Sequence, residues 1–87
     1  MDLGLKNKVA LVTAASRGLG RAVAEELAAE GASLLICSRK QETIERVANE
    51  IREATGADVF GAAADVSNPD DVGRLVDAGT QRFGRID

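Results

Sequence analysis

Residues 9–22 read VALVTAASRGLGRA, a run in which four apolar residues lead into a short segment with two closely spaced glycines. Apolar residues without polar alternation at 9–12 predict a strand that is covered on both faces. From Leu19 onward the apolar residues recur at helical spacing. The chain must therefore leave a buried strand, turn sharply at the glycines and enter a helix.

The same pattern occurs twice more along the chain. Residues 34–37 and 59–64 predict two further buried strands, each followed by a segment with helical periodicity. Three apolar stripes predict helices: Leu19, Ala22, Val23 and Leu27; Ile44, Val47, Ala48 and Ile51; Val72, Leu75, Val76, Gly79 and Phe83. Glycines end all three helices and Asn68-Pro69 opens the third: Gly31, Gly56 and Gly84 are the three C-terminal glycines.

Strands and helices that alternate in this way pair in parallel through right-handed crossovers. We therefore predict an α/β fold, the N-terminal βαβαβα half of a Rossmann doubly wound parallel sheet with strand order 3-2-1. We expect residues 1–87 to be the N-terminal portion of a single dinucleotide-binding domain, ending before strand four. No linker or internal domain boundary is visible.

Composition excludes several classes of function. Eleven basic and 14 acidic residues give a net charge of −3, so neither a nucleic acid nor a membrane surface is expected as partner. The chain has no histidine and one cysteine, which excludes a Cys/His metal site, a histidine-based triad and an internal disulfide. With no signal-peptide pattern or long apolar run, we expect a cytoplasmic protein.

The turn after the first strand has the features of a phosphate-binding elbow. The first turn of a helix presents unpaired amide hydrogens and partial positive charge, which bind a pyrophosphate when the backbone can approach closely. Gly18 and Gly20 permit that approach, whereas Ala14 occupies the position of the first glycine expected in such turns. A glycine-rich turn without a ligand, as in other α/β proteins, is the alternative interpretation.

The ends of the second and third strands favour a dinucleotide with an additional phosphate. About 20 residues after the glycines, an acid would hold a ribose 2′-hydroxyl, and an arginine would accept a 2′-phosphate. The segment there is Ser38-Arg39, and Arg17 lies within the elbow. These residues predict NADP(H), although each arginine alone could be a solvated loop cation. Asp65-Val66 follows the third strand, where the carboxylate either accepts from the adenine amino group or stabilises a turn.

Together these residues resemble the classical short-chain dehydrogenase/reductase family. The family's motif T-G-x-x-x-G-x-G lies on 13–20, with a departure at Ala14. Arg17 and Arg39 are similar to the basic residues of its NADP-preferring subgroup, and Asp65-Val66 matches the pair that frames adenine. Within the family, 3-oxoacyl-acyl-carrier-protein reductases look most similar. The resemblance implies coenzyme contacts at Thr13, Ala15, Ser16, Arg17, Gly18, Leu19, Gly20, Ser38, Arg39, Asp65 and Val66.

The resemblance further implies an NADP(H)-dependent oxidoreductase that interconverts a carbonyl and a secondary alcohol by hydride transfer. Its substrate would be a small carbonyl compound, such as a 3-oxoacyl thioester on acyl-carrier protein, and the protein would form a homo-oligomer, a tetramer in much of the family. The family's catalytic Asn, Ser and Tyr-x-x-x-Lys have no counterparts in residues 1–87. We therefore predict no catalytic residue and no metal ligand here, and no activity for these 87 residues alone.

Other classes of function fit the sequence less well. A phosphate-loop NTPase needs a Lys-Ser or Lys-Thr pair after the glycines, and a methyl-transferring variant of the fold needs an acid after the second strand; both are missing. A non-catalytic nucleotide-binding or self-assembling half-domain remains the alternative. The first strand of a three-stranded half-sheet presents a bare edge, so we expect these residues alone to be marginally stable, to self-associate through that edge, or to be the ordered remnant of a longer chain.

Overall fold

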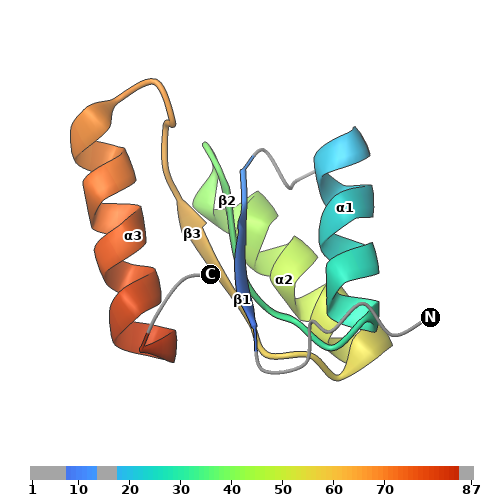
Figure 1. Cartoon of the computed structure of the whole chain (residues 1–87). Helices are drawn as coiled ribbons and strands as arrows, with labels where there is room; N and C mark the ends of the chain where they lie inside the picture. The colour runs from blue at the N-terminus through green and yellow to red at the C-terminus, as the bar shows by residue number, and fades with distance from the viewer. Residues whose placement is uncertain (1–7, 14–17, 85–87) are drawn as a thin grey trace.

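The computed structural model describes residues 8–13 and 18–84, which form three strands and three helices in strict alternation (Figure 1). The elements are β1 (Val9–Val12), α1 (Gly18–Ala29), β2 (Ser33–Ser38), α2 (Gln41–Thr55), β3 (Val59–Ala63) and α3 (Pro69–Phe83). All strand pairs are parallel, and the order β1-β2-β3 is the predicted 3-2-1 order viewed from the opposite edge. The predicted α/β half-sheet is confirmed.

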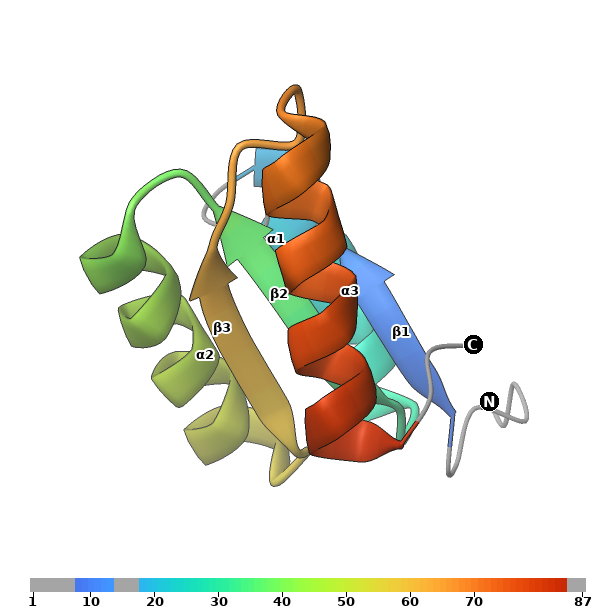
Figure 2. The same cartoon turned by 90° about the vertical axis from the view of Figure 1, so that its left-hand side faces the viewer.

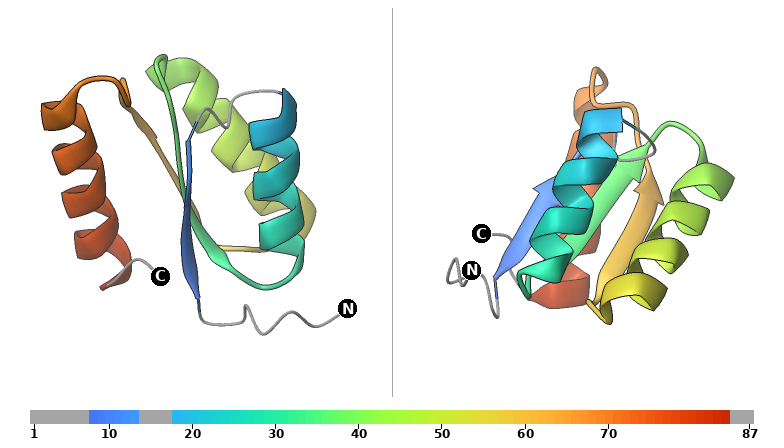
Figure 3. Two further views of the ribbon diagram at one scale, coloured as in Figure 1. Left: turned by 45° about the horizontal axis from the view of Figure 1, so that its top comes forward. Right: turned by 90° about the vertical axis from the view of Figure 1, so that its right-hand side faces the viewer.

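The helices cover the two faces of the sheet unequally. Helices α1 and α2 lie side by side on one face, whereas α3 lies alone across the other (Figures 2 and 3). The central strand β2 is therefore enclosed, and residues Leu34 to Cys37 have no exposed surface. Because both faces are covered, this strand reads as a continuous apolar run in the sequence. No helix within the described ranges is long and apolar enough to cross a membrane.

The main hydrophobic core lies between the sheet and the pair α1 and α2. Helix α2 contributes the predicted stripe Ile44, Val47, Ala48 and Ile51, each at most 1% exposed. The second cluster, between the sheet and α3, is smaller: its buried members are Leu35, Cys37, Ala64 and Leu75. The face that two helices cover thus supplies more of the apolar burial that stabilises the fold.

The predicted buried face of α1 is only partly correct. Leu27 packs against the main core, but Leu19 and Val23 are 82% and 43% exposed, and the fully buried residues of the helix are Ala24 and Ala28. Alanine side chains are short, so the helix can approach the strands closely where they lie. Leu19 and Val23 then fall on the more exposed side of the helix.

The predicted helix ends are confirmed. The side-chain oxygen of Asn68 accepts hydrogen bonds from the backbone amides of Asp70 and Asp71, and Pro69 follows as the first helical residue. Gly56 and Gly84 end α2 and α3 in the left-handed region, at φ of 75° and 85°. A residue with a Cβ would be strained at both positions.

The outer edge of β3 is closed by helix α2. Asp58 and Ala64 bond to β2, so the backbone groups of Val59 and Ala63 face away from it. Nη1 of Arg52 donates to the Val59 carbonyl at 2.9 Å, and the Ala63 amide donates to Oε1 of Gln41 at 2.9 Å. By contrast, the opposite edge of the sheet is β1, which pairs with no second strand within the described residues.

Candidate functional site

The predicted site residues that the structure describes gather at one edge of the sheet. Because the three strands are parallel, their carboxyl ends meet at the same edge, and α1 begins there as well (Figure 1). Thr13 follows β1, Ser38 ends β2 and Asp65 lies two residues beyond β3. In open α/β sheets, this edge is where ligands bind.

The described part of the elbow is open to a ligand. Gly18 begins α1 with a φ of 64°, and a Cβ placed on it would meet no atom within 4 Å. Thr13 is exposed, and Leu19 projects from the first turn of α1 with 82% of its surface accessible. The backbone at this helix start can therefore be approached from outside. Four residues of the elbow lie outside the described residues: Ala14, Ala15, Ser16 and Arg17.

The end of β2 presents a guanidinium group to solvent. Arg39 is exposed, and no hydrogen bond or ion pair joins its side chain to another residue in the described ranges. The preceding Ser38 is half-buried, and its hydroxyl donates to the Lys40 carbonyl at 3.3 Å. The charge of Asp65 acts on this cation, but no direct hydrogen bond or ion pair within the described residues occupies the guanidinium, which is therefore available to an anionic group of a ligand.

The end of β3 holds Asp65 in a tight turn. Its Oδ1 accepts from the amide of Ser67 at 3.0 Å and from the hydroxyl of Ser67 at 2.6 Å. Its backbone amide donates to Oδ2 of Asp71 at 3.0 Å, and its carbonyl accepts from the Asn68 amide at 2.9 Å. The turn-forming role considered for Asp65 is therefore present. Val66 beside it is 53% exposed.

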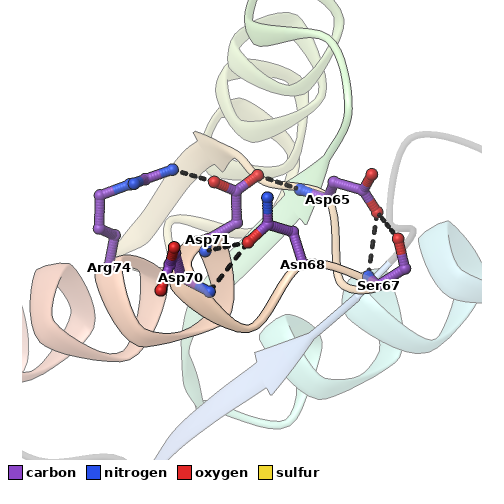
Figure 4. A network of polar contacts seen from close by, with 6 residues as sticks. All are labelled: Asp65, Ser67, Asn68, Asp70, Asp71 and Arg74. Atoms are coloured by element: carbon purple, nitrogen blue, oxygen red, sulfur yellow. Dashed lines mark hydrogen bonds and ion pairs between the residues drawn. The ribbon is translucent and has the colours of Figure 1, made fainter.

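Asp65 also has a free oxygen and a stabilised charge. No hydrogen bond from the described residues reaches its Oδ2, which points away from the turn (Figure 4). The hydroxyl of Ser67, followed by its amide, lowers the pKa of Asp65 below the ordinary value, and the positive charge of Arg39 adds a smaller effect. Asp65 is thus an ionised acceptor near Arg39, with one oxygen available to a donor.

One residue at this edge escaped prediction from the sequence. The sequence pattern assigns Asp71 no place in the site, yet its carboxylate bonds the backbone of Asp65 from the first turn of α3. Its position three residues after the capping Asn68 is the signal that could have drawn attention to it, because a residue there often reaches back toward the preceding loop.

Comparison with known proteins agrees with this arrangement. The family model for short chain dehydrogenases matches residues 8–87. The 11-beta-hydroxysteroid dehydrogenase 1A of Arabidopsis thaliana is 43% identical over 83 residues, which are 95% of this chain and 24% of that protein. A granaticin polyketide synthase putative ketoacyl reductase 1 of Streptomyces violaceoruber is 42% identical over 79 residues, 91% of this chain and 29% of that protein.

A solved structure is similar over the whole chain. L-sorbose reductase from Gluconobacter frateurii, complexed with NADPH and L-sorbose, superposes with a TM-score of 0.95 at 36% identity. The match covers 100% of this chain and 33% of that one. The chain thus spans about a quarter to a third of the length of the proteins it resembles. The strand order, the open start of α1 and the family match together show that the chain belongs to the short chain dehydrogenase family.

Proposed function

We propose that this chain is the coenzyme-binding part of an NADP(H)-dependent oxidoreductase that interconverts a carbonyl compound and a secondary alcohol. The observation that carries the proposal is Arg39, an exposed guanidinium at the carboxyl end of β2 that forms no hydrogen bond or ion pair with any other described residue. An acid at this position would bond a ribose hydroxyl and repel a 2′-phosphate, whereas an arginine attracts the phosphate.

The rest of the edge supports the same ligand. Gly18 leaves room for a pyrophosphate beside the amides that begin α1, and the positive end of that helix favours an anion. Asp65 offers Oδ2 to the amino group of adenine, and the exposed Val66 offers an apolar contact to the ring. The residues present therefore fit the coenzyme. When bound, it supplies or accepts the hydride.

Support for the reaction class comes from the relatives. The L-sorbose reductase is complexed with NADPH, and the Streptomyces protein is described as a putative ketoacyl reductase. We therefore propose a 3-oxoacyl thioester as the first carbonyl substrate to assay, with a homo-oligomer as the active form. The acid–base residues for the carbonyl lie, in this proposal, beyond residues 1–87.

The test is Arg39→Asp in the full-length protein, with the affinities for NADPH and NADH measured by calorimetry. Loss of a charged hydrogen bond costs ~1.5–3 kcal/mol, so affinity for NADPH should fall about 10- to 150-fold while that for NADH is kept. Arg46→Asp makes the same change on the exposed surface of α2 and should leave the preference intact. An unchanged NADPH preference in Arg39→Asp would refute the proposed role.

A further inference from the structure

A ring of hydrogen bonds joins the turn after β3 to the first turn of α3, and Figure 4 shows its side-chain bonds. Within it, the Asn68 amide donates to the Asp65 carbonyl, the Asp71 amide donates to Oδ1 of Asn68 at 3.4 Å, and the Asp65 amide donates to Oδ2 of Asp71 at 3.0 Å. Two of these bonds join a backbone amide to a side-chain oxygen, and the third joins two backbone groups. The ring therefore sets the path of the whole segment 65–71.

Asp71 is the part of this ring that connects the helix to Asp65. It is the third residue of α3, where a carboxylate is stabilised by the helix dipole. Its Oδ1 accepts from Nη2 of Arg74 one turn later, which leaves Oδ2 directed at the Asp65 amide. Both oxygens are thus engaged, so the carboxylate cannot rotate without losing a charge-assisted bond.

The effect of Asp71 on Asp65 is a matter of orientation. Asp71 holds the backbone amide of Asp65, and Ser67 holds Oδ1 of its side chain. With both ends of the residue restrained, Oδ2 has one direction left, away from the turn (Figure 4). An acceptor restrained in advance binds a donor without the entropic cost of ordering it.

We propose that Asp71 is a positioning residue for the coenzyme: it holds Asp65 so that Oδ2 accepts from the adenine amino group. The inference rests on the proposed function, because it takes the coenzyme to be NADP(H) and Asp65 to face its adenine. It adds a residue of α3 that does not itself touch the ligand. Asp71 therefore contributes to selection of the base, not to general stability alone.

The experiment compares NADPH with its analogue in which purine replaces adenine, so that the amino group is missing. Affinities of the full-length protein are measured by coenzyme fluorescence, and circular dichroism confirms that each variant is folded. The wild type should prefer NADPH at least about tenfold, the lower end of the range for one hydrogen bond to a charged acceptor. Asp65→Ala should remove this preference.

Asp71→Ala should reduce the preference below about threefold while affinity for the purine analogue changes less than about twofold. Asp71→Asn keeps an oxygen that can accept from the Asp65 amide and should restore most of the preference. Asp70→Asn is the matched control: Asp70 is the preceding, exposed acid of the same helix turn, and its carboxylate bonds no other described residue. The Asp70→Asn variant should prefer NADPH over the purine analogue as strongly as the wild type does. Asp71→Ser serves as a second truncation should the alanine variant not fold.

Equal loss of affinity for both coenzymes in Asp71→Ala or Asp71→Ser would overturn the inference, because a merely structural role weakens both alike. An asparagine variant as impaired as the alanine variant would also overturn it. Equal affinity of the wild type for NADPH and the purine analogue would show that Asp65 does not bond the adenine amino group, and this result would also overturn the inference. The Arg39→Asp result is separate, because it concerns the 2′-phosphate, so failure of either proposal can be recognised on its own.

Discussion

Gly61 lies in the middle of β3, under helix α2, and a larger residue there should destabilise the protein. A Cβ at this position would lie 2.9 Å from the carbonyl oxygen of Ile44 and 3.3 Å from Cβ of Ala48, whereas ordinary contact begins at 3.4 Å. The nearer atom belongs to the backbone of α2 and cannot rotate away. To relieve this overlap, α2 would have to move away from the sheet, which would disturb the packing of its buried apolar residues.

The expected magnitude follows from this overlap. Inserting a carbon into a well-packed core typically costs ~1–3 kcal/mol, and we expect Gly61→Ala to fall in this range. The free energy of unfolding is measured by urea denaturation of the full-length protein. Gly73→Ala provides the matched control, because Gly73 is an exposed helical residue of α3 with no atom within 4 Å of its Cβ position.

The control should change stability in the opposite direction. Alanine is favoured over glycine inside a helix by about 1 kcal/mol, so Gly73→Ala should raise the urea midpoint while Gly61→Ala lowers it. Because α2 begins two residues after Arg39, displacement of the helix should also weaken NADPH binding. Gly61→Ala with a midpoint equal to or above that of the wild type would refute the close approach of α2 to β3.

Two further predictions concern the core and the turn after β3. Ile51→Ala removes a side chain that is 1% exposed and should lower the free energy of unfolding by ~2–5 kcal/mol in urea denaturation; a loss under 1 kcal/mol would contradict its place in the core. Ser67→Ala removes the main cause of the lowered pKa of Asp65, so NMR titration should show that pKa rising toward its ordinary value. A carboxyl whose pKa is lowered by folding stabilises the protein at pH values above its ordinary pKa, and this stabilisation is lost as the pH falls through the lowered pKa. The stability of the Ser67→Ala variant should therefore depend less on pH below about 4 than that of the wild type. An unshifted titration of Asp65 in the variant would contradict the Ser67 bonds.

The elements of this fold could be predicted because their signals are local. Asn68-Pro69 begins α3 through groups within three residues, and Gly56 ends α2 through its own φ. The buried face of α1 could not be predicted in this way. A count of large apolar residues favoured Leu19 and Val23, but contact with the sheet is set by how closely the helix can approach, which Ala24 and Ala28 decide.

The candidate site was predictable to a similar degree. Ser38, Arg39 and Asp65 follow strands whose parallel order places their ends together, so their shared edge follows from topology. Two bonds do not follow from any pattern. Gln41 reaches the Ala63 amide across 22 residues, and Asp71 reaches Asp65 only because of the path that the chain takes between them.

The bonds from Gln41 and Arg52 affect the edge of the sheet at which a further strand can be added. Both side chains occupy backbone groups that a neighbouring strand would need, so a strand added beside β3 would first have to displace them. Addition of a strand beside β1 is therefore favoured. Helix α2 thus favours addition of strands at only one edge of this sheet. Removal of its two polar side chains would leave a second strand edge with unpaired backbone groups.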